Sequence, residues 1–464
     1  GGTAPAAGDT KHCAGDRQFD SKIVYYVPPC VPKWTGGDNG GATYMGVTDK
    51  EIKVVVFEAQ PDPAVDTLLK SVDLGSNPSE RQTFREAAEK FINERYEFYG
   101  RKFVFDVYTG TCDTLPPDYA CFRNDMRTMV REKKPFIVIW NTPLASAAFD
   151  ELSKLRVINI GGHHFDEGFS VARRPYHYDW RMSGTKLAKF LAEYWCKRLA
   201  GAKAQFAQDP LMQQETRVLG VITPDDPANQ RVLQEFQGMV KGCGGGVKAT
   251  YSYQQDIDRA NEQRKAGLKR MRDAGVTTLM CICDGIAPYF MVITENEDAY
   301  FPENIVPGSG GMDFDPVGRL YSVGTGWENA FGVSTLPVLE PYANNEAARV
   351  WRAAGNGGNP PYNLAMNDWA YYELVAGALQ MAGPNLNPGT FEQGAFRSGR
   401  PSDNPIHDAR GFGPGDYSQV DDIKIVTWSR TARSNLDGRP GAYVPQDGGK
   451  RYQLDQQPKK PATR

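Results

Sequence analysis

The sequence lacks three features that would each point to a function. No window holds the roughly 18 consecutive apolar residues that a bilayer-crossing helix needs. Neither sign of charge dominates, because 53 Lys and Arg face 56 Asp and Glu for a net charge of −3, so nothing favours nucleic acid or an anionic membrane as partner. The G-x-S-x-G, P-loop and strand-following G-x-G-x-x-G signatures are also missing. The missing signatures argue against serine hydrolases of the G-x-S-x-G type, P-loop NTPases and dinucleotide-binding enzymes.

The composition is that of a soluble globular chain. Its 464 residues suffice for two or three domains, and 40% of them are hydrophobic and 23% charged. The 48 glycines and 32 prolines imply many turns and long loops. The opening GGTAPAAGDTKH is predicted to be a flexible tether of a mature exported protein, with any lipid on a cysteine upstream of Gly1. The closing QLDQQPKKPATR is predicted to be a disordered tail.

The eight cysteines favour an oxidising compartment, because their number is even and the chain is rich in turns. Eight buried thiols in a cytosolic protein are the alternative. Cys13 and Cys30 flank one short loop, and Cys112 and Cys121 flank another, so a disulfide would close each loop.

The other four cysteines are less easily paired. Cys281 and Cys283 lie two apart in an apolar strand, where they are expected to face the same side and not to bridge each other. One of them would pair with Cys243 or Cys196, or both would remain in the core.

From about residue 50, short apolar runs alternate with segments of helical periodicity, and after a pause the alternation begins again. This order predicts parallel βαβ units in two open sheets, with a cleft between two α/β lobes. Strands are expected at 52–59, 102–110, 136–141, 156–162, 217–224, 247–253, 277–285, 304–310 and 421–430. Helices are expected at 81–100, 124–134, 144–155, 183–201, 229–242, 260–275, 287–299, 345–355 and 367–383.

Five segments in this order carry a resemblance to a known family. They are GVTDKEIKVVVFEA, GRKFVFDVYTGTCD, FIVIWNTPLASAA, the Tyr-containing helix 367–380 and GFGPGDYSQVDDIKIVTWSR. Over residues 46–430 the chain resembles the branched-chain amino-acid-binding type of substrate-binding protein, the type I periplasmic binding fold of ABC importers. The resemblance implies two Rossmann-like lobes with parallel sheets, joined by a three-strand hinge.

The family pattern also implies a division of the chain. The expected crossings between lobes lie near 180–183, 325–331 and 403–407. Residues 46–181 plus 330–403 would then form lobe 1, and 182–329 plus 404–435 would form lobe 2. An N-terminal extension (1–45) and a C-terminal tail (436–464) would flank them.

In the first lobe, ligand contacts are expected where strands end and helices begin. The family holds a ligand carboxylate at one such place with a hydroxyl and backbone amides, which here matches Ala145 and Ser146; Ser146 as an ordinary first-turn residue is the alternative. After the next strand stand Gly162, His163 and His164. Either histidine would donate to the ligand or pack in the loop, and the spacing does not suit a metal.

In the second lobe, Asp284 is expected to accept from a ligand hydroxyl or amine, or only to cap the following helix. Ser309 is also expected to contact the ligand; it and Gly310 stand where amino-acid-binding members carry an acid, which puts an α-amino acid ligand in doubt. Glu58 ends the first strand and would point toward the cleft mouth. Aromatic side chains near the cleft, with Trp140 and Tyr178 as the selected candidates, would suit a ring-bearing ligand unless they only pack in the core.

These features predict an extracytoplasmic, bacterial solute-binding protein, periplasmic or held at the cell surface by lipid. It would capture one small organic molecule, carboxylated and partly apolar or aromatic, and deliver it to ABC permease subunits. A monomer without cofactor or metal is expected. The alternatives are the ligand-sensing ectodomain of a receptor or regulator, and a cleft hydrolase in which Glu58 and Asp284 face each other.

Overall fold

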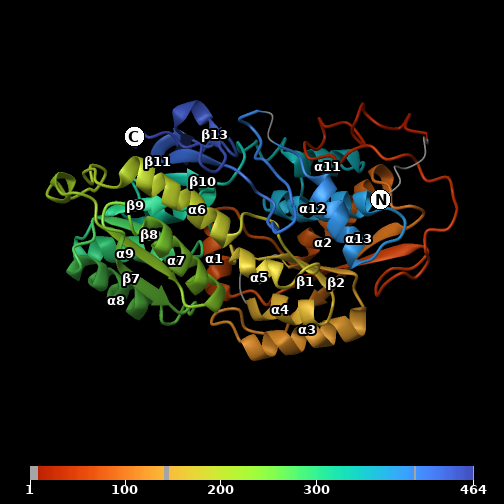
Figure 1. Cartoon of the computed structure of the whole chain (residues 1–464), viewed down its shortest axis with the longest axis horizontal. Coiled ribbons are helices and arrows are strands. Elements are labelled where there is room, and N and C mark those ends of the chain that lie inside the picture. Colours follow the sequence, from red (N-terminus) through yellow and green to blue (C-terminus); the bar gives the residue numbers. More distant parts are fainter. Residues whose placement is uncertain (1–8, 141–145, 163, 402–403, 463–464) are drawn as a thin grey trace.

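The computed structural model describes residues 9–140, 146–162, 164–401 and 404–462, and its strands form two separate sheets (Figure 1). One sheet and its helices occupy one half of the molecule, which we call the first lobe; the other sheet and its helices form the second lobe. The two-lobed α/β architecture expected from the sequence is confirmed.

The first sheet has five parallel strands in the order β2-β1-β3-β4-β5. Val54, Val55 and Val56 are buried on both faces of β1, as is typical of a central parallel strand covered by helices on each side. The strands are β1 (Glu51–Glu58), β2 (Lys102–Thr109), β3 (Ile137–Trp140), β4 (Ile158–Gly161) and β5 (His177–Asp179).

Helices cover both faces of this sheet. α2 begins with a capping box, in which Asn77 and Glu80 each accept the backbone N–H of the other. The helices around the sheet are α2 (Pro78–Arg95), α3 (Tyr119–Lys133), α4 (Ser146–Lys154), α5 (Glu167–Val171), α11 (Glu346–Ala353), α12 (Ala365–Ala382) and α13 (Pro388–Ser398). A further helix, α1 (Pro63–Ser71), lies between the two lobes in Figure 1.

The second sheet runs β12-β11-β10-β9-β8-β6-β7, and β13 pairs with β11. Strands β7 to β10 and β6 are parallel, whereas β11 and β12 are antiparallel. The strands are β6 (Leu219–Pro224), β7 (Val247–Tyr253), β8 (Thr278–Cys281), β9 (Glu303–Val306), β10 (Phe331–Ser334), β11 (Ile423–Arg433), β12 (Pro440–Pro445) and β13 (Arg451–Tyr452).

Its helices again lie on both faces. Two separate clusters of buried apolar side chains pack against this sheet, one of which includes α6 and α7 and the other α8 and α9. The helices are α6 (Gly184–Tyr194), continued by a π-helical turn (Trp195–Leu199), α7 (Pro227–Val240), α8 (Ala260–Asp273), α9 (Ala287–Asp298) and α10 (Asp315–Leu320), with short 3₁₀ turns at Met212–Gln214, Tyr321–Val323 and Asp447–Gly449.

The described parts of the two terminal extensions, residues 9–45 and 436–462, each pack against a lobe. Val24 and Val27 are fully buried in the apolar core of the first lobe. At the other end, β12 and β13 join the second sheet, and the side-chain amide of Gln457 donates to the carbonyl of Phe190. Although these segments are polar overall, a few apolar and hydrogen-bonding residues anchor them to the lobes.

The crossings between lobes are expected near 180–183, 325–331 and 403–407. The first crossing joins β5 to α6, and the third lies between α13 and β11. The second differs: β10 pairs with β9 and β11 in the second sheet, so the crossing follows Ser334 instead of preceding residue 330. Phe331 and Val333 are buried there, and the four-residue run FGVS is too short to show a periodicity that would assign it to a strand.

All eight cysteines form disulfides. The predicted Cys13–Cys30 and Cys112–Cys121 loops are confirmed. The expectation for the others is wrong, because Cys196 pairs with Cys243 and Cys281 pairs with Cys283. Strand β8 ends at Cys281, and the chain then bends so that the Cα atoms of Cys281 and Cys283 are 5.2 Å apart, closer than the roughly 6.6 Å between alternate residues of an extended strand.

Candidate functional site

A cavity of about 870 Å³ lies between the lobes, at the carboxyl ends of strands from both sheets. In the first lobe its wall includes Glu58 and Thr109, the last residues of β1 and β2. In the second lobe the wall includes Tyr253, which ends β7, and Asp284, which follows β8. Ligands of open α/β sheets bind at this edge, and the volume falls in the upper part of the range for small-molecule sites, about 300–1,000 Å³.

The first lobe contributes a cluster of charged groups to the cavity wall. Arg81 and Arg85 lie one turn apart on α2, and both reach the carboxylate of Glu58, with N–O distances of 3.0 and 2.6 Å. Arg85 is 5% exposed, and its Nε is buried without a hydrogen-bond partner within the described structure. Beside it lies Asp368 of α12, whose pKa is raised to about 6 by desolvation despite a hydrogen bond from Tyr362 and the nearby Arg85.

The second lobe contributes an acid with hydrogen-bonded partners. Asp284 Oδ2 accepts from the hydroxyl of Tyr253 at 2.5 Å and the side-chain amide of Gln255 at 3.3 Å. Its Oδ1 accepts the backbone N–H groups of Ile286 and Ala287 at the start of α9. Asp284 therefore holds the backbone at the start of α9 and also lines the cavity, and its contact with a ligand stays a prediction.

Helix α1, which was not predicted from the sequence, supplies an apolar wall of the cavity. It begins with Asp62 as N-cap and Pro63 in the first turn, a signal that could have revealed it. Val65, Leu68 and Leu69 line the cavity. Although the helix follows β1 of the first lobe, Leu68 and Leu69 pack against the apolar core of the second lobe.

Ser146 begins α4 as expected, but its hydroxyl has a partner within the protein. It donates to Asp226 Oδ2 at 2.9 Å, and the hydroxyl of Tyr119 donates to the same atom at 3.3 Å. Asp226 caps α7 of the second lobe, so this carboxylate joins the two lobes. The other residue proposed here, Ala145, lies outside the described residues. Ser146 does not line the cavity, and its ligand contact stays a prediction.

The residues after β4 pack inside the first lobe. Gly162 has a positive φ of +96°, and a side chain there would come within 3.3 Å of Asp179 Oδ2. His164 is buried, its Nδ1 lies 2.7 Å from the carbonyl of Met182, and burial lowers its pKa to about 4, which keeps it neutral at physiological pH. His163 lies outside the described residues. Neither Gly162 nor His164 lines the cavity, and their ligand contact stays a prediction.

The three remaining candidates are buried and do not line the cavity, so their ligand contacts stay predictions. Trp140 packs among Phe57, Phe122 and Phe149, and Tyr178 packs against Phe391, Phe412 and Tyr417. Ser309 is 2% exposed and donates to the carbonyl of Cys283 at 3.4 Å.

The wall next to Ser309 is formed by Gly310, which has a φ of +57° and lines the cavity. A side chain there would meet the carbonyl oxygen of Cys283 at 2.7 Å, so the wall needs glycine. Of the ten candidates, Glu58 and Asp284 thus lie on the cavity wall, whereas Arg81, Arg85 and Tyr253 were missed.

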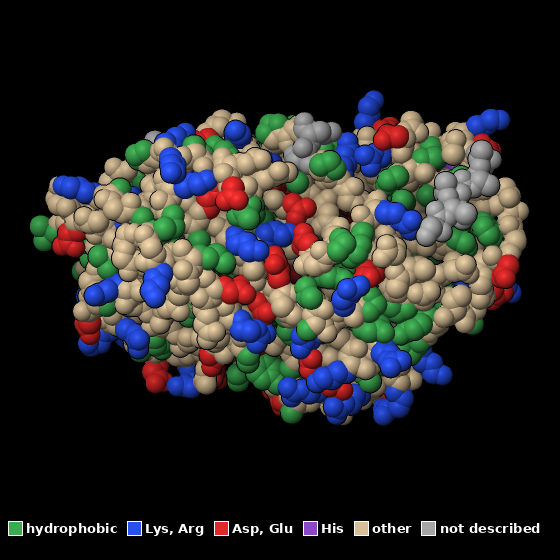
Figure 2. Space-filling model, viewed as in Figure 1, with side chains coloured by type: hydrophobic (Ala, Val, Ile, Leu, Met, Phe, Trp, Pro, Cys, Tyr) green, Lys and Arg blue, Asp and Glu red, His purple; other side chains and the backbone are tan. Residues whose placement is uncertain are grey.

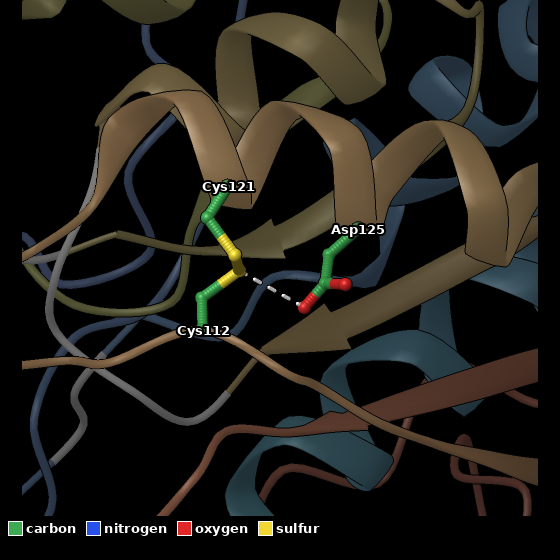
Figure 3. A group of neighbouring side chains, drawn as sticks. All are labelled: Cys112, Cys121 and Asp125. Carbon is green, nitrogen blue, oxygen red and sulfur yellow. Dashed lines mark hydrogen bonds between the residues drawn. A yellow bond between two sulfur atoms is a disulfide. The ribbon is translucent and has the colours of Figure 1, made fainter.

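One group of potential metal ligands occurs among the described residues, formed by Cys112, Cys121 and Asp125 (Figure 3). The two sulfurs form a disulfide and cannot act as thiolate ligands. The carboxylate of Asp125 accepts hydrogen bonds from the backbone N–H and the hydroxyl of Thr111, at 2.7 and 2.8 Å, so both of its oxygens have a partner within the protein. The group fixes the loop before α3.

On the molecular surface, acidic and basic side chains are interspersed along the junction of the two lobes (Figure 2). Arg231 of α7 and Asp166 before α5 form an ion pair of 2.8 Å across this junction. In the part of the chain that the structure describes, no helix is both long and apolar enough to cross a bilayer.

Comparison with known proteins places the fold. No family model matches the sequence, and no curated protein matches it. Among solved structures, an ABC-transporter solute-binding protein of Rhodopseudomonas palustris BisB5 in complex with 3,4-dihydroxybenzoic acid is 14% identical, with a TM-score of 0.58 over 87% of this chain and 98% of that chain. A periplasmic binding protein of Burkholderia mallei is 11% identical, with a TM-score of 0.60 over 88% of this chain and 96% of that chain.

A leucine-, isoleucine-, valine-, threonine- and alanine-binding protein of Brucella ovis in its closed conformation is 13% identical, with a TM-score of 0.57 over 89% of this chain and 98% of that chain. The chain therefore has the fold of the type I periplasmic solute-binding proteins, as the sequence resemblance implies.

Proposed function

We propose that this chain is an extracytoplasmic solute-binding protein of an ABC importer, which captures one small organic molecule between its lobes. The observation that carries the proposal is the cavity whose walls come from the strand ends of both sheets. A ligand that contacts both lobes stabilises the closed state over the open one, which is how such a receptor reports occupancy to its permease partners.

The finer parts of the proposal rest on the surroundings of the cavity. Its walls combine apolar side chains of α1 and α9 with the charged groups around Glu58 and Asp284, which suits a carboxylated and partly apolar or aromatic solute. The four disulfides favour an oxidising compartment, in a periplasm or at a cell surface. We further propose a monomer, held to a membrane by lipid at most.

A thermal-shift screen of a broad solute panel, followed by isothermal titration and mass spectrometry, tests the function. We expect at least one solute to raise Tm, to bind with 1:1 stoichiometry and to be recovered unchanged. Leu68→Trp, which fills the cavity from α1, should abolish this binding, whereas Leu211→Trp at an exposed position outside the cavity should not. Absence of any ligand, or consumption of the bound compound, would contradict the proposal.

A further inference from the structure

The cavity contains one hydrogen-bond donor that the protein leaves unused. Among the described lining residues, the Nε of Arg85 is the buried side-chain polar atom without a partner. Arg85 is 5% exposed, and its Nη2 donates to Glu58 at 2.6 Å. Buried polar atoms in native proteins are nearly always hydrogen-bonded, and an unsatisfied donor of a charged group is especially unfavourable. An acceptor on a bound ligand would satisfy it.

The second guanidinium at this place is also open to a ligand. The side chain of Arg81 is 28% exposed on the cavity wall, 3.0 Å from Glu58, and its remaining bonds to Ser76 are longer, at 3.3 and 3.4 Å. Two guanidinium groups offer ten N–H donors, more than one carboxylate can accept. A planar carboxylate matches guanidinium geometry better than a neutral acceptor does.

The place that the sequence favours for a ligand carboxylate is engaged by the protein itself. The hydroxyl of Ser146 donates to Asp226, so a carboxylate of the second lobe already lies at the start of α4. A ligand carboxylate there would meet a like charge at close range, which is unfavourable. The two guanidinium groups of α2 lie beside two acids, Glu58 and Asp368. Unlike the hydroxyl of Ser146, however, they carry positive charge, and the Nε of Arg85 is free of a partner among the described residues.

The rest of the cavity is suited to an apolar body. Val65, Leu68 and Leu69 of α1 form one wall, and Phe290 and Met291 of α9 lie on another. The cavity volume of about 870 Å³ is that of a site for a drug-sized molecule and exceeds what a free amino acid fills.

We propose that the cavity takes an apolar carboxylic acid larger than a free amino acid, with its carboxylate on Arg85 and Arg81 and its body between α1 and α9. This rests on the proposed solute-binding function and names the class of solute. The carboxylate-binding role that the family resemblance implies for Ser146 then belongs to α2.

The first experiment compares acids with their primary amides at pH 7.5, by titration calorimetry on the full chain. The probes are 2-naphthoate, deoxycholate, 2-naphthamide and deoxycholamide, with leucine as the small reference. At least one acid should bind about tenfold or more tightly than its own amide, as expected for a charge-assisted hydrogen bond, and leucine should bind more weakly than that acid. Equal affinity for acid and amide would overturn the proposal.

Variants then locate the carboxylate. Arg85→Lys keeps the charge but removes the Nε donor, and should weaken acid binding about tenfold with little effect on the amide. Glu58→Gln removes the competing charge and should strengthen acid binding at least threefold, a direction that a purely structural role would not produce. Arg127→Lys, whose partner Glu151 lies outside the cavity, is the matched control and should change neither.

The two proposals can fail separately. If Ser146→Ala weakens the acid selectively while Arg85→Lys does not, the carboxylate lies at α4 and the inference is wrong. If neither acids nor amides bind but another solute in the panel raises Tm, the binding function stands and the acid is excluded. If no solute binds, both proposals fall.

Discussion

Ser146→Ala tests how the two lobes are held together. The hydroxyl of Ser146 donates to the carboxylate of Asp226 across the junction at 2.9 Å, and such charge-assisted bonds contribute about 1.5–3 kcal/mol. Asp226 retains bonds from Tyr119 and from the backbone N–H of Ala228, so we expect the lower value, about 1.5 kcal/mol. The closed state then loses roughly tenfold in population relative to the open state.

This loss should appear in ligand affinity. Because closure of the lobes is part of binding, the Kd of every ligand should rise by up to about tenfold, by the same factor for charged and uncharged ligands. Titration calorimetry with two ligands of different charge measures this, and small-angle scattering of the ligand-free protein should show a larger or unchanged radius, never a smaller one.

A matched control lies on the same helix. Ser153 lies on α4 too, and its buried hydroxyl donates to the carbonyl of Phe149 within the first lobe. Ser153→Ala should lower the free energy of unfolding without changing ligand affinity. If Ser146→Ala leaves affinity unchanged, or if both variants change it equally, the Ser146–Asp226 contact does not couple the lobes.

Three further predictions concern stability. Burial raises the pKa of Glu295 from 4.5 to about 8, so between these pH values the folded state holds a proton that the unfolded state releases. The free energy of unfolding therefore falls as pH rises toward 8. Glu295→Gln should remove this pH dependence and be more stable than wild type at pH 8.5, as measured by urea titration. Glu303→Gln should instead destabilise the protein by about 3–5 kcal/mol at pH 7, because it breaks the buried bidentate pair with Arg217; a neutral result would show that the pair is dispensable. Replacing Cys196 and Cys243 together by Ala should lower the unfolding free energy by up to about 4 kcal/mol, the chain-entropy value for a 47-residue separation, and an unchanged urea midpoint would argue against that account.

Much of the fold could be predicted from local patterns. The buried runs Val54–Val56 and Ile137–Trp140 are parallel strands as expected, because strands covered on both faces are continuously apolar. The loops closed by Cys112 and Cys121, and by the N-terminal cysteine pair, followed from short spacing. These features depend on residues that lie close together in sequence.

The parts that could not be predicted depend on distant partners. Ser146 begins α4, where the resemblance implies a ligand contact, yet its hydroxyl donates to Asp226, which lies 80 residues later in the chain. Arg81 and Arg85 looked like ordinary polar positions of an amphipathic helix, and Glu58 at the end of β1 gives them their place on the cavity wall. The short β10 became a strand through pairing with β11, which periodicity does not report.

The position of α1 constrains how the protein admits a solute. This helix is joined to β1 by residues 59–62 only, while Val72 and Leu74, just beyond its end, are buried in the apolar core of the second lobe. Helix α1 therefore links β1 of the first lobe to the apolar core of the second lobe. A rotation that separates the two sheets must therefore extend residues 59–62 or detach α1 from the second lobe. The width to which the cavity can open for a solute is thus limited by the length of these four residues.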